Sequence, residues 1–179
     1  NAQGLNHPSI GTYLSNLGQT FRLQGRYDDA KAVYNRAIRI YENALGADNI
    51  QAVPALFGLA SVKQETGLHD KAERLLKRAL TIEEKFLGPE HPYLAITLGS
   101  LASLYHDNGD YAKAIGFEKR SLKISEKALG PNHIDVADSL DGLGLAYQML
   151  GQYENSMPFY KRAIEITEKA KGPNSPDLA

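Results

Sequence analysis

Three histidines recur in this sequence in similar surroundings, and histidine is the side chain most often used to bind metals near neutral pH. They are His7, His91 and His133, each preceded by an acidic or amide residue. Zinc ligands converge at about 2 Å from one metal, whereas equivalent points on successive packed helices lie at least about 8 to 10 Å apart. His69 and His106 also lack the His-Glu-x-x-His spacing. We therefore expect no metal site and assign the three recurring histidines to helix starts.

Four arginines and four glutamates recur at one fixed spacing of 42 residues. A ladder of arginines that binds phosphates is one interpretation. The matching glutamates favour a second one, in which the arginines pair with carboxylates and their long stems cover apolar surface. With 20 Lys and Arg against 21 Asp and Glu, the chain also lacks a basic field, so we expect no nucleic-acid partner. The two columns are Arg36, Arg78, Arg120 and Arg162, and Glu42, Glu84, Glu126 and Glu168.

Signatures of catalysis are absent from the sequence. There is no cysteine, which excludes a thiolate zinc site and a cysteine nucleophile. There is no Gly-x-Ser-x-Gly elbow, no Gly-x-x-x-x-Gly-Lys phosphate loop and no Gly-x-Gly-x-x-Gly turn. We therefore expect a protein that is not an enzyme and that carries no cofactor.

Targeting and membrane segments are not visible either. No apolar run approaches the roughly 20 residues that a membrane span needs, so we expect no membrane partner. The N-terminus lacks a basic segment followed by an apolar one, although a chain that starts at Asn1 could be a processed or cut product. These features favour a cytoplasmic location, while the lack of cysteine is compatible with either redox compartment.

Two columns of glycines reveal an internal repeat. Gly25, Gly67, Gly109 and Gly151 are spaced by 42 residues without insertion or deletion, and a second column has the same period. Self-similarity at a period of 20 to 50 residues is typical of solenoids and propellers, in which each unit buries its apolar face against its neighbours. The second column consists of Gly46, Gly88, Gly130 and Gly172.

The spacing of apolar residues predicts two helices in each unit. Ile10, Leu14, Leu17, Gly18 and Phe21 follow the stripe of an amphipathic helix. A second such stripe, from Ala30 to Tyr41, follows the first glycine. Nothing comparable supports strands, so we expect an all-α fold of helix-turn-helix units. The 42-residue period alone is also compatible with HEAT and armadillo arrays.

Signals at the helix ends agree with this interpretation. The first helix of each unit should end at the glycine between the two helices, because glycine adopts the left-handed conformation that ends a helix without steric cost. A polar residue, followed by proline in two copies, should start the same helix. Because proline lacks a donor and clashes with the preceding turn, we expect the second unit's first helix to start late, near Val53, or to kink at Pro54. Pro158 should lie inside the last helix.

The order of small and aromatic residues in each unit resembles the sequence pattern of tetratricopeptide (TPR) repeats. Small residues recur once in the first helix and twice in the second, with aromatic residues between them. The long connection from Leu87 to Pro92, Leu-Gly-Pro-Glu-His-Pro, resembles the repeats of kinesin light chains. Lys63 and Glu118 depart from the pattern at aromatic positions. The small residues are Gly18, Ala60, Ala102 and Gly144, then Ala30, Ala72, Ala114 and Ser156, then Ala37, Ala79, Ser121 and Ala163.

This resemblance implies a right-handed α-solenoid that forms a single array over residues 1–179. The repeats should span about 6–47, 48–89, 90–131 and 132–173, with 174–179 as the start of a truncated further repeat. Kinesin light chains read acidic peptides partly through a row of asparagines in the first helices. That row here reads Asn16, Gly58, Ser100 and Gly142, so we do not expect the same specificity.

The resemblance also implies a concave groove, lined by the first helices, that holds a peptide. Phe57 and Ile96 would receive apolar groups, Arg22 a carboxylate, and Asp138 with Asp141 a basic partner. The inward residues should be Thr12, Ser15, Gln19, Arg22, Phe57, Ser61, Gln64, Ile96, Ser103, His106, Asp138, Asp141, Leu145 and Gln148.

We expect the function to be that of a scaffold that binds a protein or peptide. One alternative is a regulatory or ligand-sensing domain of a larger multidomain effector. Another is self-assembly through uncapped ends, because the last helix carries Phe159, Ala163 and Ile166 with no helix after it to cover them.

Overall fold

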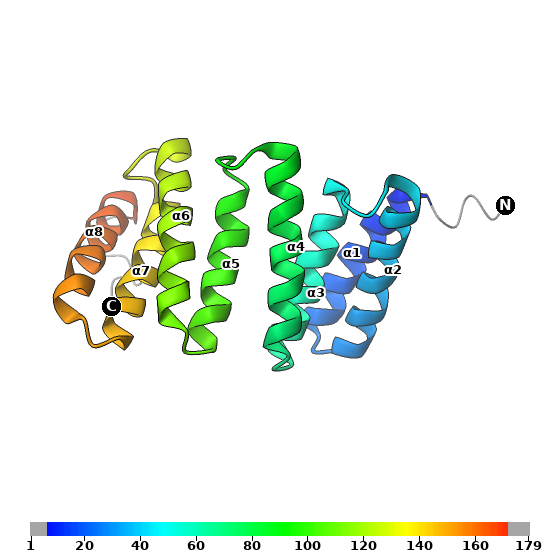
Figure 1. Cartoon of the computed structure of the whole chain (residues 1–179), viewed down its shortest axis with the longest axis horizontal. Coiled ribbons are helices and arrows are strands. Elements are labelled where there is room, and N and C mark those ends of the chain that lie inside the picture. Colours follow the sequence, from blue (N-terminus) through cyan, green and yellow to red (C-terminus); the bar gives the residue numbers. More distant parts are fainter. Residues whose placement is uncertain (1–6, 172–179) are drawn as a thin grey trace. The chain divides into compact units, whose positions relative to one another are not determined.

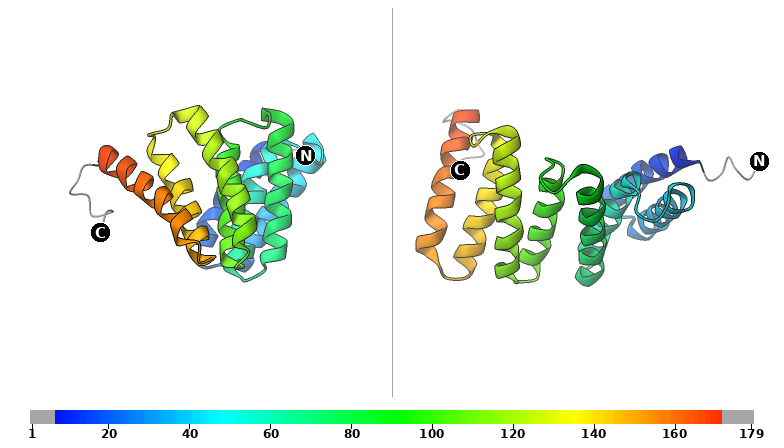
Figure 2. Two further views of the ribbon diagram at one scale, coloured as in Figure 1. Left: turned by 60° about the vertical axis from the view of Figure 1, so that its left-hand side comes forward. Right: turned by 45° about the horizontal axis from the view of Figure 1, so that its top comes forward.

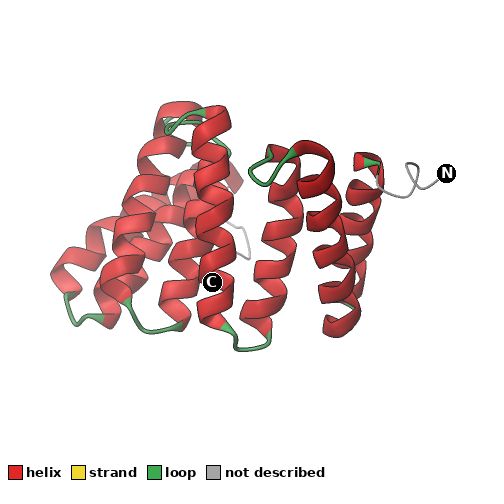
Figure 3. Cartoon of the chain, turned by 45° about the vertical axis from the view of Figure 1, so that its right-hand side comes forward, coloured by secondary structure: helices red, strands yellow, loops and turns green. Residues whose placement is uncertain are grey.

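The computed structural model describes residues 7–171, which form eight α-helices and one 3-10 turn and contain no strand (Figure 3). The all-α expectation is therefore confirmed. Residues 172–179, expected to close the fourth repeat and open another, lie outside the described residues. The elements are α1 (Pro8–Leu23), α2 (Tyr27–Leu45), η2 (Ile50–Ala52), α3 (Val53–Glu65), α4 (His69–Leu87), α5 (Leu94–Asp107), α6 (Tyr111–Leu129), α7 (Ile134–Met149) and α8 (Tyr153–Lys171).

The chain divides into two compact units, residues 1–89 and 90–179, and this division coincides with the expected boundary between the second and third repeats. Each unit contains two helix-turn-helix pairs, as Figures 1 and 2 show for α1 with α2 and for α7 with α8. We refer to the first helix of each pair as the A helix and to the second as the B helix. The paired antiparallel packing is that of a TPR solenoid.

The turn inside each pair depends on a left-handed glycine. In the first pair Gly25 has φ 72°, a conformation that costs glycine no steric energy. Its N–H donates to Arg22 O at 2.9 Å, and the N–H of Arg26 donates to Phe21 O at 2.9 Å. These two bonds form a Schellman motif, which satisfies carbonyls that the end of α1 leaves unpaired.

The second glycine column serves a different purpose. Gly130 follows α6 with φ 91° and ψ 157°, a region of backbone conformation that only glycine occupies readily. Gly46 and Gly88 adopt nearly the same angles after α2 and α4. Each of these glycines is the C-cap of its B helix, and the chain leaves the helix through an extended, positive-φ conformation rather than through a Schellman motif.

Local signals set the starts of two A helices as expected, whereas α5 begins at Leu94 with Tyr93, and not His91, as its N-cap. His7 Nδ1 accepts a hydrogen bond from the N–H of Ser9 at 3.3 Å, and His133 Nδ1 accepts one from the N–H of Asp135 at 3.3 Å. These histidines are N-caps. The late start of the second A helix is also confirmed, because η2 precedes α3, which begins at Val53 with Pro54 in its first turn.

Two members of the arginine column join consecutive repeats within a unit. Arg78 Nη2 lies 2.7 Å from Glu42 Oε1 and donates to Ala47 O at 2.5 Å. Arg162 Nη2 lies 2.5 Å from Glu126 Oε1 and donates to Pro131 O at 2.8 Å. The interpretation of this column as ion pairing is confirmed at these two positions.

The expectation for the last helix needs a correction. Ile166 of α8 is only 1% exposed and packs with Val136 and Leu140 of α7. Phe159 stacks on Tyr147 with ring centroids 5.6 Å apart. The expectation is therefore wrong for Ile166, which faces the partner helix. Other apolar residues of α8, Met157 and Ile164, are 43% and 50% exposed. Pro158 lies inside α8 without ending it.

The requirement for glycine in the connection after α6 is tested by one pair of substitutions. Gly130→Ala should destabilise the protein by about 1 to 3 kcal/mol, because alanine is strained at that φ and ψ. Gly116→Ala, at an exposed helical position where an added methyl group meets only open space, should stabilise it by about 0.5 to 1 kcal/mol. Urea unfolding followed by circular dichroism measures both changes, and equal effects of the two variants would contradict this account.

Candidate functional site

The expected groove residues of the first unit are largely engaged with one another or with neighbouring groups. Thr12 Oγ1 is hydrogen-bonded to Tyr41 OH at 3.0 Å, while Gln19 is exposed. Ser15 is only 8% exposed and its hydroxyl donates to Gly11 O at 2.8 Å. Ser15 therefore lies in the helix interface and we leave it out of the binding surface proposed below.

The carboxylate partner expected for Arg22 comes from the same unit. Arg22 of α1 forms an ion pair with Glu65 at the end of α3. Phe57 and Gln64 of α3 are half-buried, and Ser61 donates to Phe57 O at 3.2 Å. The face of the two A helices in this unit is thus partly closed by its own side chains.

The corresponding residues of the second unit are more open. Ile96 is 64% exposed, and Ser103, Asp138, Asp141 and Leu145 are exposed as well. Their helices, α5 and α7, are the A helices of this unit. Two further expected residues lie at the helix ends. Gln148 Oε1 accepts a hydrogen bond from Tyr160 OH at 2.8 Å. Burial lowers the pKa of the half-buried His106, while the backbone of Gly142 and the charges of Asp107 and Asp141 raise it to a smaller extent.

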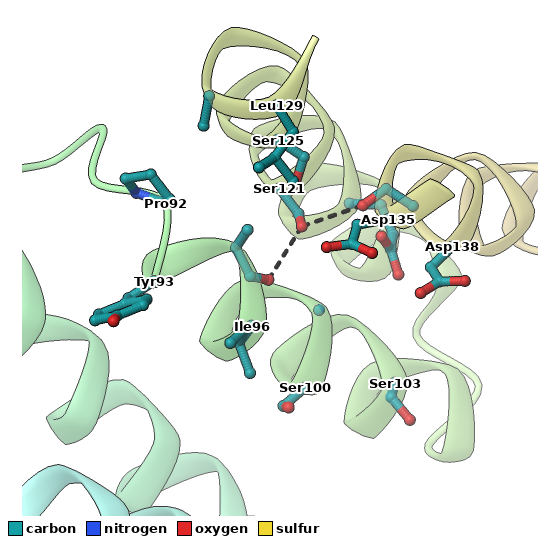
Figure 4. A pocket seen from close by; sticks show the side chains of 15 residues that line it. Pro92, Tyr93, Ile96, Ser100, Ser103, Ser121, Ser125, Leu129, Asp135 and Asp138 are labelled. Atoms are coloured by element: carbon teal, nitrogen blue, oxygen red, sulfur yellow. Dashed lines mark hydrogen bonds between the residues drawn. The ribbon is translucent and has the colours of Figure 1, made fainter. Parts of the chain in front are cut away.

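A cavity of about 630 Å³ lies among α5, α6 and α7 in the second unit (Figure 4). Of the expected groove residues it brings together Ile96, Ser103 and Asp138. The other lining residues are Pro92, Tyr93, Ala95, Gly99, Ser100, Glu118, Ser121, Ser125, Ala128, Leu129, Asp135 and Ser139.

Two buried serines tie the three helices together beside the cavity. Ser121 of α6 donates to Ala95 O of α5 at 3.1 Å, and Ser139 of α7 donates to Ser121 Oγ at 3.1 Å, as the dashed lines in Figure 4 show. The hydroxyls form a continuous chain across three helices. The polar wall of the cavity is therefore held in place by hydrogen bonds.

Glu118 of α6 is the most unusual group in this wall. It is only 6% exposed, and its Oε2 atom has no hydrogen-bond partner among the described residues. Burial raises the pKa of Glu118 to about 8; the charges of Asp138 and Asp141 also raise it, and a hydrogen bond with Ser139 lowers it in part. The side chain is thus largely protonated at neutral pH, because removing charge avoids the desolvation of a buried carboxylate.

The sequence indicated Glu118 only as a departure from an aromatic position. Its counterparts at the 42-residue spacing are Tyr34, Leu76 and Tyr160. The single charged residue in this column was the available signal. Its burial and its proximity to two aspartates of another helix depend on packing, which the spacing does not reveal.

Comparisons with known proteins agree with the repeat pattern. The sequence pattern of the tetratricopeptide repeat matches residues 1–43, 51–127 and 119–169. No curated protein sequence matches the chain. Among the described residues, no helix is both long and apolar enough to span a bilayer.

Several solved structures share the fold. BtubC (BKLC) from P. vanneervenii is 20% identical, with a TM-score of 0.86 over 94% of this chain and 68% of that chain. A putative kinesin light chain from Podosopora anserina with nearly identical TPR-like repeats is 24% identical, with a TM-score of 0.83 over 96% and 82% of the two chains. MamA is 21% identical, with a TM-score of 0.69 over 92% and 82%.

The raised pKa of Glu118 predicts how stability depends on pH. Between pH 4.5, the ordinary value, and about 8 the folded chain keeps a proton that the unfolded chain has lost. The stabilisation that the Glu118 proton gives to the folded chain is therefore fully present below pH 4.5 and is lost as the pH rises to about 8. Over this range the free energy of unfolding should fall by up to about 1.4 kcal/mol per pH unit. Glu118→Gln should remove this slope in urea unfolding measured from about pH 5 to 8.

The matched control for this measurement is Glu165→Gln, which changes an exposed carboxyl of α8. The difference in unfolding free energy between the wild type and this control should stay constant over the same pH range. A Glu118→Gln profile parallel to that of the wild type would show that the Glu118 pKa is not raised.

Proposed function

Because the chain belongs to the tetratricopeptide repeat family, we propose that it binds a segment of another protein against the A helices of its second unit, α5 and α7. Tetratricopeptide repeats generally act as protein-interaction modules. The observation that carries the proposal is the cavity of about 630 Å³ bordered by both of these helices. Its volume lies in the range of about 300 to 1,000 Å³ that is usual for binding pockets.

The exposed residues of α5 and α7, both in the cavity and beyond it, suit a peptide better than a small molecule. Ile96 and Leu145 are apolar and 64% and 40% exposed, and they lie on different A helices together with exposed Ser103 and Asp141. Exposed apolar side chains rimmed by polar ones are typical of protein-interaction surfaces. A peptide would place one side chain in the cavity and its neighbours on these residues.

The first unit contributes less to this proposal. Arg22 and Glu65 already pair with each other, and Thr12 pairs with Tyr41. A peptide would have to displace these contacts before it could use the same groups. We therefore place the contacts on α5 and α7 of the second unit.

A blocking substitution tests the proposed surface. Peptides selected from a random library on the immobilised protein should bind Ser103→Tyr at least tenfold more weakly than the wild type in fluorescence polarisation. The reason is that a neutral ring at this exposed position would fill the mouth of the cavity. Lys161→Ala, which changes an exposed residue of α8, should alter the affinity less than twofold.

Thermal melts of both variants show whether the fold is retained. Selected peptides that bind Ser103→Tyr as well as the wild type would contradict the proposed surface, as would a library that yields no binding peptide.

A further inference from the structure

The cavity exists where one recurring core position changes its chemistry. In the first unit this position is Tyr34 of α2, which is 2% exposed and whose ring lies against Gly58 of the next A helix. In the second unit it is Glu118 of α6, whose carboxyl lies against Gly142 of the next A helix. A Cβ atom at residue 142 would lie only 2.4 Å from Glu118 Oε1. A carboxyl group thus takes the place of an aromatic ring between two A helices.

This replacement is costly unless the carboxyl meets a partner. A buried tyrosine ring contributes apolar contact, whereas an ionised carboxylate without a partner is strongly disfavoured in the interior. Only 6% of Glu118 is exposed, and Oε2 has no hydrogen-bond partner among residues 7–171. The folded chain therefore leaves a buried oxygen of Glu118, a residue of the cavity wall, without a hydrogen-bond partner among the described residues.

The charges around the cavity have one sign. Asp135 and Asp138 line it beside the largely protonated Glu118, and none of its lining residues is a lysine, arginine or histidine. Asp141 lies on the same helix as Asp138 and acts on Glu118 in the same direction. Lys119, the neighbour of Glu118, extends over the ring of Tyr147, with Nζ 5.6 Å from the centroid. A concave surface with acidic walls concentrates cations.

The remaining lining residues fit a cation that has an apolar stem. Tyr93, Ile96 and Leu129 provide apolar surface, and Ser103 and Ser125 provide hydroxyl groups. Lysine and arginine side chains combine a long apolar stem with a charged head in this way. We propose that the cavity receives a lysine or arginine side chain of the bound peptide, with Glu118 as its counter-ion. This assignment rests on the proposed function.

Binding of such a side chain is coupled to proton release. Free Glu118 keeps its proton up to about pH 8, and a cation in the cavity favours the carboxylate. Asp138 and Asp141 of α7 act on the same group and favour the proton. Burial lowers the pKa of His106 of α5, which disfavours a positive charge on that ring. The affinity should therefore rise as the pH increases from about 6.5 to 8.5.

A double-mutant cycle tests the proposed ion pair. The probe is a selected peptide that Ser103→Tyr weakens, together with its variants in which each lysine or arginine is replaced in turn by norleucine. One such replacement should weaken binding to the wild type at least tenfold, and Glu118→Gln should weaken binding of the unchanged peptide at least tenfold. When the two changes are combined, the affinity should be less than twofold weaker than with either change alone, because both remove the same interaction.

Isothermal titration in phosphate and in Tris at neutral pH adds a readout that a purely structural role of Glu118 would not change. The wild type should release close to one proton on binding, and Glu118→Gln should release none. Glu118→Tyr, which restores the aromatic residue found at position 34, should fill the cavity and abolish binding. Glu165→Gln, an exposed carboxyl of α8, should behave as the wild type in both measurements.

The outcomes separate this inference from the proposed function. A peptide that Ser103→Tyr weakens, but that binds equally well with norleucine at every basic position, would overturn the ion pair and leave peptide binding intact. Additive effects of the two changes, or equal proton release from Glu118→Gln, would overturn it as well. Peptides insensitive to Ser103→Tyr would contradict the proposed function, and the ion pair with it.

Discussion

Within each unit, one side chain of a B helix lies between two successive A helices. Tyr34 of α2 lies against Gly18 of its own A helix and Gly58 of the next, and neither glycine has room for a Cβ atom. Glu118 of α6 lies against Gly142 in the equivalent place. Because protein interiors are densely packed, the residue at this position determines the space and the polarity between two A helices at once.

The two units use this position differently, and their surfaces differ accordingly. The tyrosine ring in the first unit fills the space, and nearby Arg22 and Glu65 pair across α1 and α3. The carboxyl in the second unit lies in the wall of a cavity that also contains Asp135 and Asp138. A helical repeat can thus keep its backbone and change the space and polarity between two A helices by changing one buried residue.

The sequence predicted the helices, their turns and their starts because these depend on residues close together in the chain. The left-handed glycines, the capping histidines and the late start at Val53 are examples of such local signals. The expectation that Ile166 would be uncovered was wrong, because helical periodicity shows that a face is apolar but not which neighbour covers it. The importance of Glu118 was missed for a similar reason, since Asp138 and Asp141, the aspartates that raise its pKa, come from a different helix.

The state of the Glu118 carboxyl group in the folded protein tests this account most directly. A ¹³C NMR titration of its side-chain carboxyl carbon, assigned by comparison with Glu118→Gln, reports the pKa of this one residue. We predict a midpoint at about 8, as expected for a buried acid beside two aspartates. A midpoint near the ordinary value of 4.5 would show that the carboxyl is solvated or already paired, and would contradict the account.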